Sequence, residues 1–332
     1  MKKILLITTG GTIVSEPTEG GLAPLLRADK ILQFVPGLDK RYDIQLLPVM
    51  NIESPDLMPH MWKDMVKAIK DHYSEYDGFV ILHGTDTLCF TASALNYMIQ
   101  NSTKPIAVTG SQYPIENNLT DGKKNLHDAI IFAAESHMAG IFVVFDSKVI
   151  SGGRVKKISS KHYDAFRSAG YPEVASVIED RVNIFVADPA PEEDVSFIED
   201  VNDRVMLLKL YPGIKPEWFD DYPEQYDALI LEGYGVGGIP ASFIPYIEKW
   251  SNRGLLVIFT TQAIYGGTDL DVYTVGHALT QSNTVIETFD MTTEAVVAKV
   301  MVVTAQTNNP QEVKRWMWTE IGHDIMVPKG KN

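Results

Sequence analysis

The sequence predicts an α/β protein of two domains, each built on an open, mainly parallel sheet flanked by helices. Three observations predict this class. Short apolar segments of strand length recur along the chain, and amphipathic helical patterns lie between them. The length of 332 residues corresponds to about two domains of roughly 150 residues each. Because alternating strands and helices favour parallel strands joined by crossover helices, we expect a doubly wound arrangement.

The expected strands are continuous apolar runs, which is typical of parallel sheets that are covered on both faces. In chain order they lie at Ile4–Ile7, Ile44–Met50, Phe79–Leu82, Ile106–Val108, Ile141–Phe145, Val205–Leu210, Leu229–Leu231 and Leu255–Phe259. The clearest helix between them is expected at residues 58–73. There, apolar side chains recur at three- and four-residue intervals from Met58 to Tyr73, and lysines occupy the opposite face.

An acidic, proline-containing segment interrupts the alternation of strands and helices. It contains Pro189, Pro191 and seven acidic residues between positions 188 and 203. We interpret residues 189–205 as a linker between domains. The prediction is an N-terminal α/β catalytic domain at residues 1–188 and a smaller C-terminal α/β domain at residues 206–332.

Composition excludes several classes of function. With 29 lysines and arginines against 43 acidic residues, the formal net charge is −14, which disfavours nucleic acids and anionic membrane surfaces as partners. One cysteine, Cys89, excludes an intramolecular disulfide, and the eight histidines lack zinc-binding spacing. No apolar run approaches the ~20 residues of a membrane span, and the N-terminal run is too short for a signal peptide. We expect a cytoplasmic protein that binds a small molecule and no metal.

Polar residues and glycines follow four of the predicted strands. They are Thr8–Thr12, Asn51–Ser54, His83–Thr87 and Thr109–Gln112. Because ligands of open parallel sheets bind beyond the carboxyl ends of the strands, we expect these segments to share one crevice. The glycines leave backbone N–H groups accessible to an oxyanion.

A threonine beside Gly10 and Gly11 is suited to act as a nucleophile. Its hydroxyl is unreactive at its ordinary pKa, so it needs a nearby base, and a lysine kept neutral by burial is one of the few side chains able to serve. The simpler interpretation is structural, because threonine favours strand ends and helix caps. The residue types alone leave both interpretations open.

Two of these segments match a known family. Ile7–Ile13 and Leu82–Thr87 resemble the two signature motifs of the bacterial-type L-asparaginases, the threonine amidohydrolases of the asparaginase/glutaminase superfamily. Further similar segments are Tyr76–Leu82, Thr91–Leu95, Thr109–Gln112, Tyr234–Gly237 and Asp290–Ala295. The chain resembles the cytosolic type I branch. The resemblance implies hydrolysis of L-asparagine to L-aspartate and ammonia without a cofactor, in a homodimer or homotetramer whose neighbouring subunit completes each site.

The resemblance also implies catalytic roles. Thr12 would be the acylated nucleophile, and Thr85, Asp86 and Lys157 would form a second triad that activates water. Two adjacent lysines stand in the lysine motif, and spacing to the following aromatic segment selects Lys157 over Lys156.

Substrate-binding roles follow from the same resemblance. The residues concerned are Gly11, Glu53, Ser54, Pro55, Gly84, Thr85, Asp86 and Ser111. The loop from Glu53 to Pro55 would hold the α-carboxylate, and Asp86 the α-ammonium. The Ser111 carbonyl would accept a hydrogen bond from the side-chain amide, and backbone N–H groups near Gly11 and Thr85 would hold the oxyanion.

The chain departs from the family pattern at two positions. Leu22 occupies the place of a tyrosine that contacts the nucleophile in many relatives, within a lid at residues 13–25 that we expect to close over the ligand. Pro55 replaces a hydroxyl or amide side chain and has no N–H, which removes one carboxylate donor. These departures concern affinity more than reaction type.

Other functions remain as alternatives. They are a glutaminase-asparaginase of broader specificity, the amidase subunit of a tRNA amidotransferase, and a non-catalytic regulator that binds a small molecule. Amidotransferase relatives carry an extra N-terminal domain, whereas the first motif begins here at residue 7, and a regulator would lose the threonines.

Two further features have competing interpretations. Gly233–Gly238 fits a dinucleotide fingerprint but lacks the acidic residue expected after the next strand, so a tight strand-to-helix turn is preferred. His83 would be either catalytic or, as we prefer, buried and hydrogen-bonded.

Overall fold

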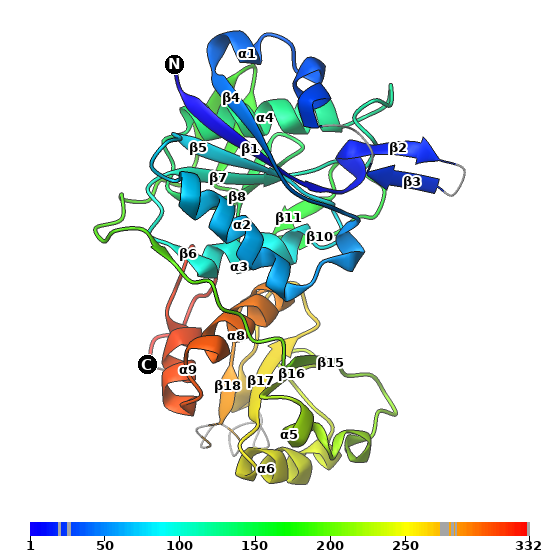
Figure 1. Cartoon of the computed structure of the whole chain (residues 1–332). Coiled ribbons are helices and arrows are strands. Elements are labelled where there is room, and N and C mark those ends of the chain that lie inside the picture. The colour runs from blue at the N-terminus through cyan, green and yellow to red at the C-terminus, as the bar shows by residue number, and fades with distance from the viewer. Residues whose placement is uncertain (19–20, 25–27, 273–278, 280–281, 283, 331–332) are drawn as a thin grey trace. The chain divides into compact units, whose positions relative to one another are not determined.

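The computed structural model describes residues 1–18, 21–24, 28–272, 279, 282 and 284–330. The chain divides into two compact units, residues 1–199 and residues 200–332 (Figure 1). Each unit is described separately below. Within the described ranges, no helix has both the length and the apolar character needed to cross a membrane.

A large sheet forms the centre of the N-terminal unit. Its strands are β1 (Lys3–Gly10), β4 (Asp43–Ile52), β5 (Gly78–Leu82), β7 (Pro105–Thr109), β8 (Gly140–Phe145), β9 (Lys148–Ser151), β12 (Ala175–Ile178) and β13 (Arg181–Ile184). The order across the sheet is β13-β12-β9-β8-β7-β5-β1-β4. From β8 to β4 neighbouring strands run parallel, and β9, β12 and β13 extend the other edge in antiparallel pairs.

Shorter elements complete this unit. The small strand pairs are β2 (Ser15–Thr18) with β3 (Gly21–Pro24), β10 (Val155–Lys157) with β11 (Phe166–Ser168), and β6 (Ile99–Gln100) with β14 (Ser196–Phe197). The helices are α1 (Leu38–Arg41), α2 (Pro59–His72), α3 (Leu88–Met98) and α4 (Gly122–Glu135), with 3-10 turns η1 (Thr12–Val14), η2 (Ala28–Phe34) and η3 (Ser54–Asp56). The predicted linker thus includes β14, which pairs with β6.

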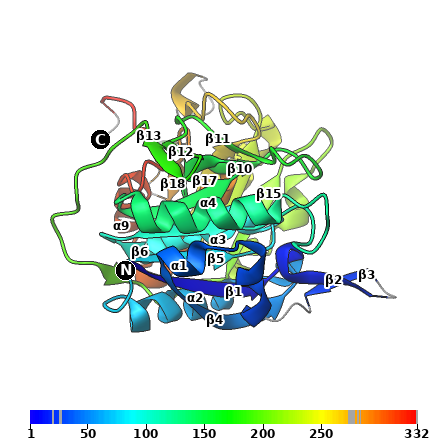
Figure 2. The same cartoon turned by 90° about the horizontal axis from the view of Figure 1, so that it is seen from above.

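Helices cover both faces of the large sheet. Helices α1 and α4 lie on one face and α2 and α3 on the other, and α4 runs across the central strands (Figures 1 and 2). Because successive strand residues point to opposite faces, Ile4 and Leu6 of β1 join the core that α4 covers, with Leu126 and Ile130 of that helix. Burial on both faces explains why these strands are continuously apolar.

The C-terminal unit is a second, smaller α/β layer structure. Its strands are β15 (Val205–Lys209), β16 (Ala228–Gly233), β17 (Leu256–Thr261) and β18 (Val285–Glu287), and its helices are α5 (Tyr222–Gln225), α6 (Ile244–Asn252), α8 (Thr293–Gln306) and α9 (Pro310–Trp318). Short 3-10 turns are η4 (Pro216–Phe219), η5 (Ala241–Phe243) and η6 (Leu270–Val272). The strands pair in chain order and all in parallel. Helix α8 packs on β15, β16 and β17, and α6 on β17.

The predicted class, two α/β units with mainly parallel sheets, is confirmed. Each of the eight predicted strands is present, and the helix predicted at residues 58–73 is α2, which begins at Pro59, a residue suited to the first helical turn. The antiparallel edge was not predicted. Its strands are short and β13 is largely exposed, so they lack the continuous apolar signal.

A buried ion pair links the segment after α9 to α8. The Lys299 ammonium donates to the Asp324 carboxylate at 2.7 Å and to the carbonyls of Met317 and Thr319 at 3.1 and 2.7 Å. Both charged side chains are fully buried. Burial lowers the pKa of Lys299, and the Asp324 carboxylate opposes this shift.

We predict that Lys299→Met lowers the free energy of unfolding by about 3–5 kcal/mol, because it leaves the Asp324 carboxylate buried without its cation. Denaturant unfolding measures this. The control is Lys249→Met, which removes an exposed ion pair to Asp220 and should change stability by less than about 1 kcal/mol. Equal effects of the two substitutions would contradict a structural role for the buried pair.

Candidate active site

The polar segments predicted to share a crevice follow neighbouring strands. β4, β1, β5 and β7 are adjacent and parallel, so the segments after Ile52, Gly10, Leu82 and Thr109 leave the sheet at the same edge. These segments contain most of the residues predicted to form the site. The structure therefore gives them a common location at the carboxyl ends of the strands.

The segments after β1 and β5 touch through their glycines. A Cβ atom on Gly11 would lie 2.4 Å from the Gly84 Cα, and one on Gly84 would lie 2.5 Å from the Ser54 Cβ. Both distances are far below a normal contact, so neither position tolerates a side chain. Gly11 also has φ of 81°, which glycine adopts without strain. Thr12 and Thr85 each lie one residue beyond this contact.

Thr12 begins the 3-10 turn η1. The Gly11 N–H donates to the Ile52 carbonyl at 2.9 Å, and the Ser15 hydroxyl donates to the Gly11 carbonyl at 3.0 Å. These bonds hold the peptide groups on both sides of the Gly11 Cα, including the Gly11–Thr12 peptide. Within the described part of the chain, the Thr12 N–H donates no hydrogen bond. Of these two N–H groups, only that of Thr12 has no acceptor among the described residues and is left for the predicted oxyanion, since that of Gly11 donates to Ile52.

Lys157 joins Thr85 and Asp86 in one cluster. Its Nζ donates to the Thr85 hydroxyl at 2.9 Å and to the Asp86 Oδ1 at 2.6 Å. The Asp86 side chain is 62% exposed and that of Lys157 only 18%. The cluster thus presents a carboxylate to solvent and keeps the amine next to the threonine hydroxyl.

The β10 strand distinguishes the two adjacent lysines. Lys157 pairs with Phe166 and Lys156 with Arg167 across the β10–β11 hairpin. Because neighbouring strand residues point to opposite faces, only one of the two can face Thr85. The contacts of Lys157 place it in the cluster.

Ser54 ties the segment after β4 to the same cluster. Its buried hydroxyl accepts from the Asp86 N–H at 3.3 Å, and its carbonyl accepts from the Thr87 hydroxyl at 2.8 Å. Glu53 precedes the turn η3 and Pro55 lies within it, and both are exposed. The structure thus joins Ser54 to Thr85, Asp86 and Lys157, and leaves Glu53 and Pro55 at the surface beside them.

The segment after β7 is held by a buried carboxylate. Asp121 accepts from the Gln112 N–H at 3.0 Å and the Tyr113 N–H at 3.1 Å, and burial raises the pKa of Asp121. Ser111, the predicted amide acceptor, is fully buried in this segment. Its neighbour Gln112 accepts from the Thr85 hydroxyl at 3.1 Å.

Gln112 and Asp121 are site-forming residues that the sequence analysis missed. The Gln112 Nε2 donates to the His162 carbonyl at 3.1 Å, which turns the amide oxygen toward Thr85. Gln112 stood in a segment already singled out, so its position beyond a strand end was a usable signal. Asp121 reaches the site only through tertiary structure, and no local pattern marks it.

His83 is buried and hydrogen-bonded, as preferred from the sequence. Its side chain is 2% exposed, its Nδ1 lies 2.8 Å from the Gly84 carbonyl, and its Nε2 lies 2.9 Å from the Thr91 hydroxyl. Desolvation lowers the pKa of His83 to about 4. The ring is therefore neutral near pH 7.

The predicted lid includes the β2–β3 hairpin, in which the Leu22 backbone pairs with that of Pro17. Parts of it, at residues 19–20 and 25, lie outside the described residues. Its closure over a ligand, and the replacement for the missing tyrosine at Leu22, stay predictions.

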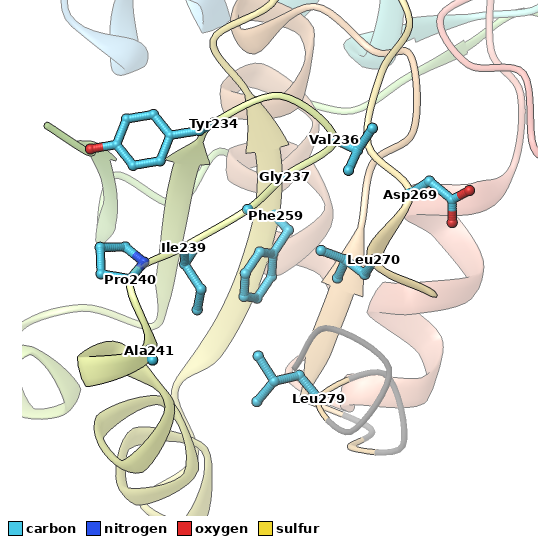
Figure 3. Close-up of a pocket in the computed structure, with 11 residues that line it drawn as sticks. Tyr234, Val236, Gly237, Ile239, Pro240, Ala241, Phe259, Asp269, Leu270 and Leu279 are labelled. Carbon is cyan, nitrogen blue, oxygen red and sulfur yellow. The ribbon is translucent and has the colours of Figure 1, made fainter. Parts of the chain in front are cut away.

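A second candidate site lies in the C-terminal unit. A cavity of about 430 Å³ is lined mainly by apolar side chains, among them Ile239, Phe259, Leu270 and Leu279. Figure 3 shows these side chains directed toward a common space, whereas the Asp269 carboxylate and the Tyr234 hydroxyl point away from it. Catalytic pockets bring polar groups together, and the labelled side chains do not.

The glycine-rich segment beside this cavity is a tight turn. The N–H groups of Gly237 and Gly238 both donate to the Tyr234 carbonyl, at 2.9 and 2.7 Å. A pyrophosphate-binding loop would keep such N–H groups accessible to the ligand. The preferred interpretation of a strand-to-helix turn is confirmed.

The fold and the cluster define a class: a two-unit α/β protein with a threonine, a lysine and a carboxylate gathered beyond its parallel strands, an arrangement suited to hydrolysis. The family model described as "Asparaginase, N-terminal" matches residues 3–189, and the model "Glutaminase/Asparaginase C-terminal domain" matches residues 204–317. The chain belongs to the asparaginase family of hydrolases.

Curated relatives match along nearly the whole chain. The L-asparaginase of Thermococcus kodakarensis is 38% identical over 328 residues, which cover 97% of this chain and 99% of the relative. L-asparaginase 1 of Escherichia coli strain K12 is 33% identical, with coverage of 95% and 96%. A glutamyl-tRNA(Gln) amidotransferase subunit of Methanosphaera stadtmanae is 31% identical over all of this chain and 78% of the relative.

Solved structures of L-asparaginases have the same fold as this chain. The thermostable L-asparaginase from Thermococcus kodakarensis superposes with a TM-score of 0.92 at 36% identity, covering 98% of this chain and all of that one. L-asparaginase I from Vibrio cholerae gives 0.87 at 29% identity, covering 98% and 99% of the two chains.

We predict that His83 makes stability depend on pH between its unfolded pKa of 6.5 and its folded pKa of about 4. The unfolded chain binds the proton more readily, so the contribution of about 3 kcal/mol is fully present above pH 6.5 and is lost as pH falls toward 4. Urea unfolding of wild type and His83→Asn across this range isolates the effect, because the other groups titrate in both proteins. A constant difference between the two curves would contradict the prediction.

Proposed function

We propose that the protein hydrolyses the side-chain amide of L-asparagine, giving L-aspartate and ammonia through an acyl-enzyme on Thr12. The observation that carries the proposal is the Lys157 amine within hydrogen-bond distance of both Thr85 and Asp86, in a chain of the asparaginase family. Relatives that are named L-asparaginase, matched over almost their full length, support the substrate.

The first half of the reaction forms the acyl-enzyme. The Thr12 hydroxyl oxygen attacks the amide carbon, and the N–H groups of Thr12 and Thr85 stabilise the charge on the carbonyl oxygen. The carbon–nitrogen bond then breaks, and the hydroxyl proton leaves with ammonia. In the second half, water positioned by Thr85 and Lys157 attacks the ester, which releases L-aspartate and restores the Thr12 hydroxyl.

Substrate binding uses charges that the cluster already presents. The exposed Asp86 carboxylate receives the α-ammonium, and Ser54 with the turn η3 receives the α-carboxylate. Pro55 brings no N–H to this turn, so we expect a weaker anchor than in relatives with a donor there. The Ser111 carbonyl accepts from the amide that is to be cleaved.

The alternatives are less well supported. The amidotransferase subunit of Methanosphaera stadtmanae is 31% identical, against 38% for the Thermococcus kodakarensis L-asparaginase. A non-catalytic regulator has no use for the hydrogen-bonded threonine and lysine. We further propose a cytoplasmic homodimer or homotetramer without a nucleic-acid partner, on the resemblance to type I relatives and the net charge of −14.

Thr12→Ala should lower ammonia release by about 10⁴-fold or more, because it removes the nucleophile and little packing. The assay is steady-state ammonia release from L-asparagine, with circular dichroism to verify the fold. Thr12→Ser, which retains a hydroxyl, is the matched control and should keep measurable turnover. Activity of Thr12→Ala above about one per cent of wild type would refute the assigned nucleophile.

We expect L-asparagine to be preferred over L-glutamine by about tenfold or more in kcat/KM. One methylene alone is worth about 1–3 kcal/mol in a simple pocket. Here Ser54 and Asp86 are joined by a hydrogen bond and fix one end of the substrate, so a longer side chain must buckle to bring its carbonyl to Thr12. Parallel kinetics with both amides test this, and equal values would favour the glutaminase-asparaginase alternative.

A further inference from the structure

A buried chain of hydrogen bonds ends at the backbone of the candidate site. The Trp62 Nε1 donates to the Thr91 hydroxyl at 3.1 Å, that hydroxyl lies 2.9 Å from the His83 Nε2, and the His83 Nδ1 lies 2.8 Å from the Gly84 carbonyl oxygen. The three side chains are all less than 4% exposed. They come from α2, from α3 and from the segment directly after β5, so this chain of hydrogen bonds forms only in the folded unit.

The two ends of this chain fix the direction of every bond in it. An indole N–H can only donate and a carbonyl oxygen can only accept. A neutral His83 therefore carries its proton on Nδ1, toward Gly84, and its Nε2 accepts the hydroxyl proton of Thr91. The opposite tautomer would set the Nδ1 lone pair against the carbonyl oxygen, which is repulsive.

The bond to Gly84 sets the orientation of a whole peptide group. In a planar trans peptide the C=O and the N–H point in opposite directions, so holding the Gly84 carbonyl aims the Thr85 N–H away from His83. In the part of the chain that the structure describes, this N–H donates no hydrogen bond. The Thr85 N–H belongs to the segment after β5. This segment contacts Gly11, which is the residue before Thr12.

A glycine is required here and makes the peptide easy to turn. Gly84 must lack a Cβ because Ser54 lies too close for one. Glycine restricts its own backbone dihedrals less than any other residue, so the Gly84–Thr85 peptide needs an external restraint. The hydrogen bond between the His83 ring and the Gly84 carbonyl supplies this restraint.

We propose that His83 is a positioning residue, whose imidazole, oriented by Thr91 and Trp62, holds the Gly84–Thr85 peptide with its N–H directed at the substrate carbonyl oxygen. The inference rests on the proposed amide hydrolysis and adds a function for a side chain that does not touch the substrate. Since the charge on that oxygen develops in the transition state, the effect belongs mainly to kcat.

Substitutions at His83 test the restraint directly. His83→Leu removes the donor to Gly84 and should lower kcat by about 10²-fold, the usual effect of losing one oxyanion donor, with KM for L-asparagine much less affected. His83→Asn places an amide N–H near the position of Nδ1 and should recover a large part of kcat. Equal kcat values for the two variants would overturn the proposal, because a packing role does not distinguish them in this way.

Thr91 offers a matched pair that leaves His83 in place. Thr91→Val keeps the shape and removes the hydroxyl that donates to the His83 Nε2, whereas Thr91→Ser keeps the hydroxyl. We expect kcat to fall by about tenfold in Thr91→Val, corresponding to one lost hydrogen bond, and to stay close to wild type in Thr91→Ser. These two Thr91 variants also test the proposal if His83→Leu does not fold.

A spectroscopic measurement separates this inference from the proposed function. Nitrogen NMR of ¹⁵N-histidine-labelled protein at pH 7, with the His83→Asn variant to assign the signal, reports which ring nitrogen carries the proton. We expect a neutral ring protonated on Nδ1 in wild type and in Thr91→Ser. A proton on Nε2, or a charged ring, would overturn the proposal. A correct tautomer in a protein that does not release ammonia from L-asparagine would instead reject the proposed substrate.

Discussion

The contact between the backbones of Gly11 and Gly84 is the constraint on which the candidate site depends. It brings together two segments that leave neighbouring parallel strands. Gly84 leaves no room for a Cβ atom on Gly11, and Ser54 leaves none for a Cβ atom on Gly84. Only glycines allow such a close approach, and because they have no side chain their backbone dihedrals are less restricted. The surrounding hydrogen bonds, from Ser15 and His83 to the Gly11 and Gly84 carbonyls, supply that restraint from outside.

The cluster has a buried end and an exposed end, and this division suits the two different tasks that we propose for Thr85 and Asp86. Thr85 is 6% exposed and is held by Gln112 and Lys157, whereas the Asp86 side chain is 62% exposed. A group that must keep one geometry through the reaction gains from burial among fixed partners. A carboxylate that meets a charged substrate gains from access to solvent, because full burial would impose a large desolvation penalty before binding.

How much the sequence could predict depended on whether a feature was local. The parallel strands and α2 were predictable because continuous apolar runs and a helical repeat report burial directly. The segments that contain Thr12, Thr85 and Asp86 could be singled out because they follow predicted strands, but the roles of these residues came from the resemblance to the asparaginase family. Asp121 and Thr91 were not assigned roles, since their partners are Gln112 and His83, and only the folded topology brings these pairs together.

The backbone N–H groups around the glycine contact differ in whether the fold gives them an acceptor. Buried N–H groups in native proteins are nearly always paired, and several around this contact are: Gly11 donates to Ile52, Asp86 to Ser54, and Gln112 to Asp121. The N–H groups of Thr12 and Thr85, in contrast, donate no hydrogen bond within the residues that the structure describes. An N–H that the fold holds in place without an acceptor is preorganised for a ligand oxygen, because no internal bond has to break when charge develops there. In the reaction that we propose, the two threonines therefore act through their backbones as well as their hydroxyls, which gives the restraint on the preceding glycine peptides a function.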